Sequence, residues 1–534
     1  MSVKYCTLPR NDKMCMSCEC TRVMSHLFLG KDCLVISALR KTKSLSCIKK
    51  SIKLQLLLVM FRVPWRNQAG ERMPGELPKL PFGHFNEVNF FGRDLSRKHG
   101  AIYFIWHCLT PVVIISDAKA IRTFYTDHYS HERESDMTCL GAVFKGILGR
   151  CLATSHGRDD VRRCRGPFEK YFSASATANH MRLIGKECQA FMNTLPVGVP
   201  IDLKASRLED ITLRVVTHVV YGKEVLEKYF EKIVELQHHL LKTLSLINVG
   251  TTRLPFYSKL PNSTNYRAAC FNQEWTKFNR FLFGLFEEGK ISGEDGLFFE
   301  TMALLKTRAL DIEEEELLHS IDEILLLNID VSFAATSFAL SDLARYQDIQ
   351  TKLRAQIDDV LQGCESSSCE DLDKKLPYLE MVLKESARLH PALALSLPEK
   401  TVKSVTDLGG YQISQGTPVC VDTYSLNYSP TYWNDPEEFN PERFSTGRQR
   451  VPGSFFQFGM GPRKCLGYRF ALAITRVVVV SFLQNFQLRL SENTSYEKVK
   501  KSGLVFFAPY ISPDIVLERR ETVDVDYLSK DGLK

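Results

Sequence analysis

The segment FGMGPRKCLG, which surrounds Cys465, constrains the fold of this chain more than any other stretch of its sequence. Gly461 and Gly467 leave room where a flat macrocyclic cofactor would approach the backbone, and glycine also accepts the dihedral angles of a tight loop. Arg463 can donate charge-assisted hydrogen bonds to a carboxylate of that cofactor, and Phe458 would shield the sulfur from water. Because Gly467 begins a predicted helix, free N–H groups and the helix dipole favour a metal-binding thiolate at Cys465.

These five residues fill every fixed position of FxxGxRxCxG, the cysteine-ligand loop of the cytochrome P450 family, which the sequence resembles here. The alternative is a buried structural cysteine in a loop before a helix. The resemblance implies a mainly α fold with a minor β portion, organised as a single large haem-binding domain. It also implies that the cofactor is haem (iron protoporphyrin IX), with Cys465 as its axial thiolate ligand.

A possible ion pair lies about eighty residues before the cysteine loop. Glu385 and Arg388 are three residues apart on one face of a predicted helix, which is common on any solvated helix. Here the pair precedes Leu389-His390-Pro391 and is followed by Pro441–Phe444, two further landmarks of the family in the same order. The resemblance implies that Glu385, Arg388 and Arg443 form a buried structural network that supports the haem-binding core.

The candidates for binding the haem propionates follow the family less closely. The segment GRDDVRRCRGPF resembles the family's helix beside the haem, in which an aromatic residue and an arginine four residues later contact a propionate. The chain keeps Arg165 but has Val161 at the aromatic position, so one donor is lost. His156 can compensate, as can Lys400, which lies where the family often has another propionate-binding arginine. Surface roles are the alternative for both.

The spacing of apolar residues predicts a long helix over residues 312–345, which would cross the domain and be buried for much of its length. By resemblance, residues 328–331 occupy the positions of a Gly-x-acid-Thr motif. Asp330 keeps the acid, Val331 replaces the alcohol, and Ser332 supplies a hydroxyl one residue later. This shift turns the hydroxyl by about 100°, so Ser332 reaches the iron only where a π-bulge widens the helix. The alternative is a hydrogen bond from Ser332 to a carbonyl one turn back.

The resemblance implies a monooxygenase that inserts one atom of O2 into a lipophilic substrate, with the thiolate favouring O–O cleavage. Asp330 and Ser332 would supply protons, and burial should raise the pKa of the Asp330 carboxyl, which suits a proton relay. Because Val331 replaces the alcohol, a haem-thiolate isomerase or dehydratase acting on a peroxide is one alternative. A haem sensor or carrier without turnover is another. The sequence specifies neither the substrate nor the position of its oxidation.

The electron donor is expected to be a separate protein. No flavin- or nicotinamide-binding glycine motif and no iron–sulfur cysteine run occurs after residue 75. The resemblance implies an NADPH-dependent diflavin reductase, with a mitochondrial ferredoxin as the alternative, and Arg463, Lys464 and Arg469 could help to dock its acidic surface. The net charge of +7 comes without the basic block and interleaved aromatic residues typical of nucleic-acid binding.

Four segments are expected: an irregular, Cys-containing extension over residues 1–50, an apolar and basic membrane-contact segment with a Pro-rich hinge over 51–75, the haem domain over 76–520 and a tail over 521–534. The apolar run Leu54–Phe61 is too short to span a bilayer but can lie in a membrane interface. We therefore expect the cytosolic face of the endoplasmic reticulum membrane, without an evident anchor. The basic, Ser-containing start keeps the mitochondrion as an alternative, and an incorrectly assigned start is the alternative to a genuine extension.

Local patterns also predict individual elements of the haem domain. Alternating apolar residues indicate a β-hairpin with strands over residues 101–107 and 112–116. Asp117 is expected to cap the helix that follows. A last helix is predicted over residues 467–485, directly after the cysteine loop.

Overall fold

The structure is a computed structural model, and it describes residues 65–520 apart from 78–83, 85–93, 108–109, 127–130, 134–148, 248–261, 295, 328, 363, 367–371, 448–449 and 493–513. The chain divides into two units, Met1–Pro64 and Trp65–Lys534. The predictions for the N-terminal extension, for the run Leu54–Phe61 and for the tail therefore fall outside the described residues.

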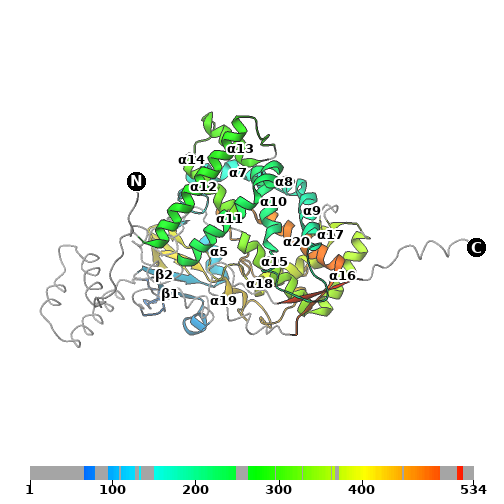
Figure 1. Cartoon of the computed structure of the whole chain (residues 1–534). Helices are drawn as coiled ribbons and strands as arrows, with labels where there is room; N and C mark the ends of the chain where they lie inside the picture. Colours follow the sequence, from blue (N-terminus) through cyan, green and yellow to red (C-terminus); the bar gives the residue numbers. More distant parts are fainter. Residues whose placement is uncertain are drawn as a thin grey trace, which may run out of the picture. The chain divides into compact units, whose positions relative to one another are not determined.

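Helices dominate the described part of the chain, and strands form a smaller portion, so the predicted fold class is confirmed (Figure 1). The helices are α5 (Ala118–Thr126), α7 (Gly157–Glu169), η1 (Lys170–Phe172), α8 (Ala174–Asn179), α9 (Met181–Met192), α10 (Glu209–Tyr221), α11 (Lys223–Ile247), α12 (Ser263–Glu287), α13 (Leu297–Lys306), α14 (Glu314–Asp322), η4 (Glu323–Leu327), α15 (Ile329–Arg345), α16 (Gln347–Leu361), α17 (Leu372–Lys375), α18 (Pro377–Leu389), α19 (Thr423–Asn427), η6 (Pro441–Phe444), η7 (Gly461–Arg463) and α20 (Tyr468–Asn485).

The predicted long helix is present as α14, the π-helical turn η4 and α15 in succession. α14 begins with a capping box, in which the Glu316 carboxylate accepts the backbone N–H of Glu313 at 3.0 Å. The run Glu314–Arg345 is long and apolar enough to cross a membrane, but 69% of its most apolar window is buried within the protein. Burial on this scale is typical of a central core helix.

The described strands form three sheets. The largest has the order β1-β2-β8-β5-β3, the second β4-β10-β9 and the third β6-β7, with bounds β1 (Ile102–His107), β2 (Thr110–Ile115), β3 (His131–Arg133), β4 (Pro200–Ile201), β5 (Glu399–Thr401), β6 (Val405–Leu408), β7 (Tyr411–Ser414), β8 (Pro418–Val421), β9 (Phe486–Leu490) and β10 (Ile515–Arg519). The predicted hairpin is confirmed, since β1 and β2 pair antiparallel with His107 opposite Thr110. Asp117 caps α5 as predicted: its Oδ1 accepts the Ala120 N–H at 2.7 Å.

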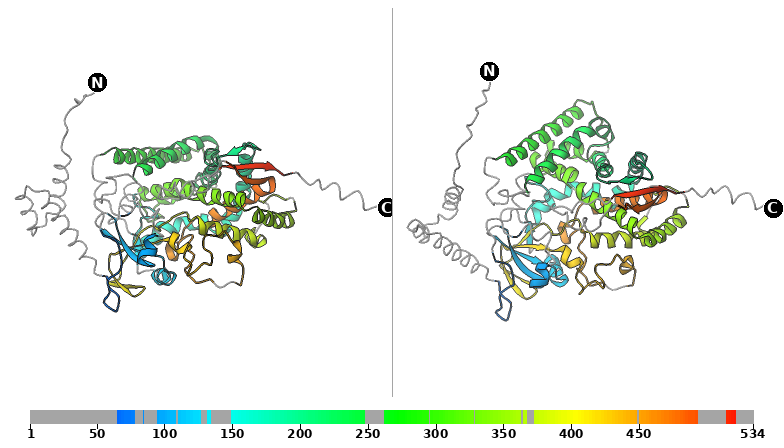
Figure 2. Two further views of the ribbon diagram at one scale, coloured as in Figure 1. Left: turned by 90° about the horizontal axis from the view of Figure 1, so that it is seen from below. Right: turned by 60° about the horizontal axis from the view of Figure 1, so that its bottom comes forward.

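Packing around α15 positions the site. α15 contacts α10, α18 and α20, so segments far apart in the sequence meet at this helix. The five-stranded sheet lies at one end of the helical part, and β9 and β10 lie at the other end, in each view (Figures 1 and 2). α20 begins directly after the cysteine loop, which brings that loop close to the central helix.

Candidate active site

A cavity of about 370 Å³ is lined by the loop around Cys465 and by the central helix. Val331 and Ser332 of α15 contribute to its wall, as do residues of α10, the segment before α7, and the connection from α18 to β5. Most of the lining side chains are apolar. Cys465 and Ser332, which lie in separate motifs of the sequence, are therefore walls of the same cavity.

The loop before α20 is closed by a backbone hydrogen bond from the Cys465 N–H to the Phe458 carbonyl, at 2.9 Å. Gly459 and Gly461 have φ angles of 74° and 69°, in the left-handed region that favours glycine. At Gly467, no atom outside its own chain neighbours lies within 4 Å of the position that an added Cβ would take, within the described part of the chain. Phe458, Cys465 and Gly467 line the cavity, so the loop offers a sulfur beside open space.

The Cys465 thiol is accessible from the cavity, although the protein encloses it on other sides. Burial raises the pKa of this thiol, and the opposing effects of the Gly467 N–H and of Arg165 do not reverse the shift. The Gly467 N–H at the helix N-terminus favours the thiolate, in the predicted direction, but burial outweighs it. A bound metal cation makes Cys465 a thiolate, because a coordinating thiol loses its proton.

Two arginines that the sequence predicts as cofactor ligands, Arg463 and Arg165, line the cavity. The Arg463 guanidinium donates to the Ser155 carbonyl, and burial together with the charge of Arg133 lowers its pKa to about 10. The Arg165 guanidinium donates to the Lys464 carbonyl at 2.8 Å. The Arg463 guanidinium is therefore held within the protein, and its expected role in docking a partner stays a prediction.

A third guanidinium on the cavity wall belongs to Arg133, which no motif marks in the sequence. β3 pairs with β5 so that Arg133 lies opposite Glu399, and Glu132 lies opposite Lys400. Since successive side chains of a strand point to opposite faces, Lys400 turns away from the cavity that Glu399 lines. Lys400 lies 3.2 Å from Glu132 instead. Of the described residues, neither Lys400 nor His156 is among those that line the cavity.

Glu399 connects Arg133 to other side chains at this end of the five-stranded sheet. Its carboxylate lies 3.4 Å from the Arg133 guanidinium, accepts a hydrogen bond from the Tyr125 hydroxyl at 3.4 Å and contacts Nδ1 of His131. Burial alone would raise the pKa of Glu399, but Arg133 and His131 outweigh it and hold this pKa below its usual value. The ionised carboxylate keeps Arg133 at the wall.

The residues around the cavity fit haem. Three guanidinium groups, those of Arg133, Arg165 and Arg463, line a mostly apolar cavity in the described part of the chain. Burial and the neighbouring charge of Arg133 lower the pKa of Arg463, and the two propionates of a bound haem would give these guanidinium groups negative partners. Gly467 leaves room for a flat ring, and Cys465 offers a ligand for its iron.

Glu385, Arg388 and Arg443 form a compact buried network. The Arg388 guanidinium donates to both oxygens of the Glu385 carboxylate at 2.8 Å, and Arg443 Nε donates to the same carboxylate at 2.9 Å. The arginines also donate to the backbone carbonyl of Asn427 at the end of α19 and to carbonyls of the segment that follows it, those of Asn434, Asp435, Pro436 and Glu438. The network therefore ties α18 and η6 to that segment, while none of its three side chains, as described, lines the cavity.

The central helix presents Ser332 to the cavity, but Asp330, predicted to act beside it, is not among the described residues that line it. The helix does contain a π-helical widening, the condition set for Ser332 to reach the iron, but η4 ends at Leu327 and so precedes Ser332. A π turn holds more residues than an α turn, so it changes which side chains of the following helix face the cavity. Asn328 lies outside the described residues. Glu323, the first residue of η4, lines the cavity as well, although no motif marks it.

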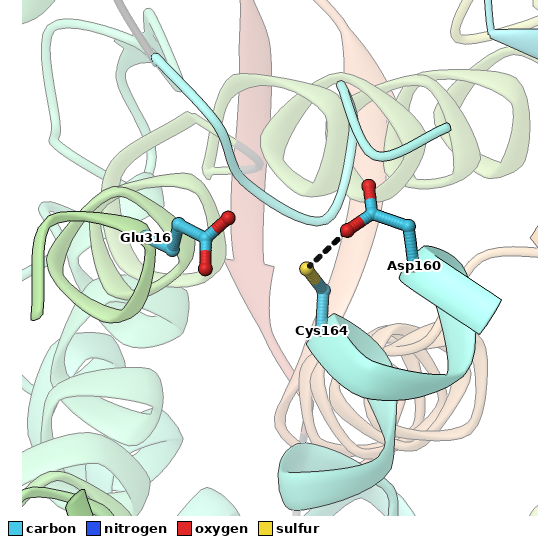
Figure 3. A group of neighbouring side chains, drawn as sticks. All are labelled: Asp160, Cys164 and Glu316. Atoms are coloured by element: carbon cyan, nitrogen blue, oxygen red, sulfur yellow. Dashed lines mark hydrogen bonds between the residues drawn. The ribbon is translucent and has the colours of Figure 1, made fainter. Parts of the chain in front are cut away.

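A second cluster of metal-type ligands, formed by Asp160, Cys164 and Glu316, lies between α7 and α14 (Figure 3). Arg163 lies 2.6 Å from Asp160 and 2.7 Å from Glu316, and Arg150 lies 3.1 Å and 2.9 Å from the same two carboxylates. Burial and the charge of Asp160 raise the pKa of the Cys164 thiol to about 11. Two guanidinium groups already balance the carboxylates, so this cluster serves as an ion-pair network between the two helices.

The profile of the family described as Cytochrome P450 matches residues 73–511. The chain is similar to the Cytochrome P450 monooxygenase verC of Clonostachys rogersoniana, with 28% identity over 80% of this chain and 85% of that protein. It is also similar to Cytochrome P450 3A13 of Mus musculus, with 27% identity over 81% and 88% of the two chains, and to a 3-beta-hydroxylase of Tanacetum parthenium, with 23% identity over 84% and 93%. The prediction of haem with an axial cysteine thiolate is confirmed at the level of the family. The chain belongs to the cytochrome P450 family and is a haem-thiolate monooxygenase.

Proposed function

We propose that Cys465 is the axial ligand of the haem and that the cavity beside it is where a lipophilic substrate is oxidised. One observation carries this proposal: the Cys465 sulfur, the Ser332 hydroxyl and the three arginines line a single, mostly apolar cavity. Bound haem supplies the iron at which molecular oxygen is activated. The apolar side chains of the wall bind the substrate by the hydrophobic effect and exclude water.

The charged residues of the cavity have separate proposed roles. Arg133, Arg165 and Arg463 bind the haem propionates, and Glu399 holds Arg133 in place. Ser332 holds a proton at its hydroxyl on the side of the cavity formed by α15. Asp330 lies two residues before it, about 200° around the helix, and supplies protons that reach this hydroxyl through an intervening water.

Replacing Asp330 by asparagine is expected to slow product formation about tenfold or more while the haem content stays unchanged, because the side chain keeps its size but cannot release a proton. Ser332→Ala should lower the product formed per O2 consumed. Both are measured by product and oxygen assays on purified holoenzyme. Thr336→Ala, one turn further along the same helix, is the control, since Thr336 is buried against Thr475 and lies outside the described cavity lining. Normal turnover of Asp330→Asn would refute the proton-supply role.

Arg133→Gln is expected to speed the loss of haem to a haem acceptor about tenfold, because one charge-assisted contact with a propionate disappears. Lys400→Gln is the matched variant, one position along on the paired strand, and should leave the rate unchanged because Lys400 lies against Glu132. The rate is followed by the absorbance of the acceptor. Faster haem loss from Lys400→Gln than from Arg133→Gln would instead indicate that Lys400 binds the propionate.

We further propose that electrons come from an NADPH-dependent diflavin reductase and that the enzyme works at the cytosolic face of the endoplasmic reticulum membrane. A lipophilic substrate and the apolar run Leu54–Phe61 support a membrane surface. Because the Arg463 guanidinium donates to the Ser155 carbonyl, the docking role is assigned to Lys464 and Arg469, whose charges lie beside the ring of Tyr468, although Lys464 also lines the cavity.

The test is turnover with NADPH, diflavin reductase and isotopically labelled O2, using a panel of lipophilic compounds. The expected result is one labelled oxygen atom per product molecule. Turnover of a lipid hydroperoxide alone, with neither NADPH nor reductase, would instead indicate an isomerase or dehydratase. If a ferredoxin system supports turnover and diflavin reductase does not, the result would favour the mitochondrion as the location of the enzyme.

A further inference from the structure

His390 follows the last residue of α18, and the proposed reaction gives it no role. α18 ends at Leu389 because Pro391 disfavours helical dihedral angles in the residue before it, and His390 has φ −124° and ψ 67°. Residues 391–397, here called the wall segment, form neither helix nor extended strand. Five of them line the cavity: Pro391, Ala392, Leu393, Ser396 and Leu397. The position of the wall segment therefore helps to set the shape of the cavity.

The central helix forms a wall of the same cavity, and one further residue extends its cavity-facing side. Ser332, Ala335 and Ala339 of α15 line the cavity. Their spacing of three and four residues defines one face of the helix, and Asp342 lies three residues beyond Ala339 on that face. Asp342 is fully buried and is not among the described residues that line the cavity. It lies on α15 just beyond the cavity-lining part.

Two residues of α15, Asp342 and Phe338, hold the ring of His390. His390 Nε2 lies 3.1 Å from Asp342 Oδ1, and because a carboxylate can only accept, Nε2 carries the proton. The His390 ring is stacked on the Phe338 ring, with centroids 4.2 Å apart and planes 4° apart. Since Phe338 and Asp342 are one helical turn apart, the hydrogen bond fixes the position of the imidazole ring and the stack fixes its tilt.

These contacts are shielded from water. The side chain of Asp342 is fully buried, that of His390 is 12% exposed, and Phe338 is buried. The other oxygen of Asp342 accepts the Ser386 hydroxyl of α18 at 2.7 Å. A hydrogen bond to a buried carboxylate is stronger than one in water, so the contact with His390 is a firm link between α15 and the start of the wall segment.

The far end of the wall segment is tied to other elements. The Ser396 N–H donates to the Val421 carbonyl of β8 at 2.8 Å, and the Val421 N–H donates to the Ser396 hydroxyl at 2.9 Å. Thr423 of α19 donates to the Ala394 carbonyl from its backbone N–H and from its hydroxyl, each at 3.0 Å. The sheet side thus holds one end of the segment, and His390 connects the other end to the central helix.

We propose that His390 is a positioning residue that fixes residues 391–393 relative to the central helix and thereby determines how tightly the cavity binds bulky apolar groups. This inference rests on the proposed function, since it requires that the cavity bind the substrate beside the haem. A wall that is in place before binding does not have to be ordered by the ligand, so a bulky ligand binds more tightly. A small ligand that does not reach the wall gains nothing from it.

The alternative is a contact that only stabilises the fold by giving the buried Asp342 carboxylate a hydrogen-bond partner. Such a contact would affect the free energy of unfolding, and its loss would weaken the binding of small and bulky ligands alike. The two explanations therefore differ in the ratio of the two affinities.

The test compares 1-methylimidazole and 1-benzylimidazole by spectral titration of the ferric holoenzyme. Both probes coordinate haem iron through the same type of nitrogen, so the ratio of their dissociation constants reports the surroundings of the benzyl group. Wild-type enzyme should bind 1-benzylimidazole at least about tenfold more tightly, because its phenyl ring is buried against apolar side chains.

His390→Phe keeps a ring for stacking on Phe338 and removes the donor to Asp342. It should weaken the binding of 1-benzylimidazole about fivefold and leave that of 1-methylimidazole unchanged. His390→Gln, whose amide N–H can take the place of Nε2–H, should recover the wild-type ratio to within about twofold. Phe338→Leu removes the stack and keeps both hydrogen bonds of Asp342. It should lower the ratio about twofold, and it tests the proposal even where His390→Phe does not retain haem.

Ser341→Ala is the control on the same helix. Ser341 is buried next to Asp342, its hydroxyl donates to the Ser337 carbonyl at 2.7 Å, and it lies outside the described cavity lining. Its loss removes a buried hydrogen bond without touching the link to the wall segment. The ratio of the two dissociation constants should stay at the wild-type value.

Four outcomes would overturn the proposal: equal affinities of the wild type for the two probes, an unchanged ratio in both His390→Phe and Phe338→Leu, a parallel weakening of both probes in these variants, or a ratio in His390→Gln no higher than in His390→Phe. Failure of the proposed function has a different signature. In that case neither probe shifts the Soret band of the wild type, and no labelled oxygen is incorporated with NADPH and reductase.

Discussion

Cys465→Ala is expected to eliminate the strongly red-shifted Soret band that ferrous haem with a thiolate ligand shows when it binds CO. The fold should survive, because the structural hydrogen bond at this position runs from the Cys465 backbone N–H to the Phe458 carbonyl and does not involve the side chain. The side chain borders the cavity, so its loss removes the iron ligand and little packing. Product formation with NADPH and reductase should fall below detection.

The control for this variant is Cys364→Ala, since Cys364 is an exposed free cysteine far along the sequence from the loop. It should retain the full CO band and the full rate of product formation. A red-shifted band of normal intensity in Cys465→Ala would refute the assignment of Cys465 as ligand. Comparison of far-ultraviolet circular dichroism spectra shows whether both variants remain folded.

Glu385→Gln is expected to destabilise the protein by about 3–5 kcal/mol, because it leaves buried positive charge without its carboxylate. The side chains of Glu385 and Arg388 are fully buried, and that of Arg443 is 8% exposed, so water cannot replace the lost partner. The change should appear as a lower midpoint of urea unfolding and as weaker retention of haem.

Glu380→Gln on the same helix is the matched control. Glu380 pairs with Arg476 through two contacts of 2.6 Å and 2.9 Å, but both side chains are 15% exposed. Partial solvation limits the loss, and we expect about 1 kcal/mol or less. Equal losses of unfolding free energy in the two variants would mean that the buried Glu385 network stabilises the protein no more than the partly exposed Glu380–Arg476 pair.

Motifs with fixed local spacing could be predicted because their residues act within one loop or one helix. The loop around Cys465 and the cap formed by Asp117 depend only on neighbours in the sequence, and both segments fold as the pattern indicates. Arg133 could not be found in this way. It reaches the cavity because β3, which has three residues, pairs with a strand 266 residues later at Glu399.

The central helix shows a second limit of sequence patterns. Its length and burial follow from the spacing of apolar residues, but the phase of its side chains depends on the π turn η4. No pattern in the sequence indicates where that turn begins and ends. The linear motif therefore placed Asp330 and Ser332 together, whereas Ser332 and the unmarked Glu323 line the cavity and Asp330, among the described residues, does not.

The ion pairs of Arg150 and Arg163 with Asp160 and Glu316 fasten α7 to α14 just outside the cavity. α7 carries Arg165, which lines the cavity, and α14 leads directly into the π-helical turn η4, whose residues Glu323 and Ile324 also line it. Four charged side chains outside the described cavity lining therefore brace two of its walls against each other from behind. The spacing of these walls is set by charges that nothing inside the cavity contacts.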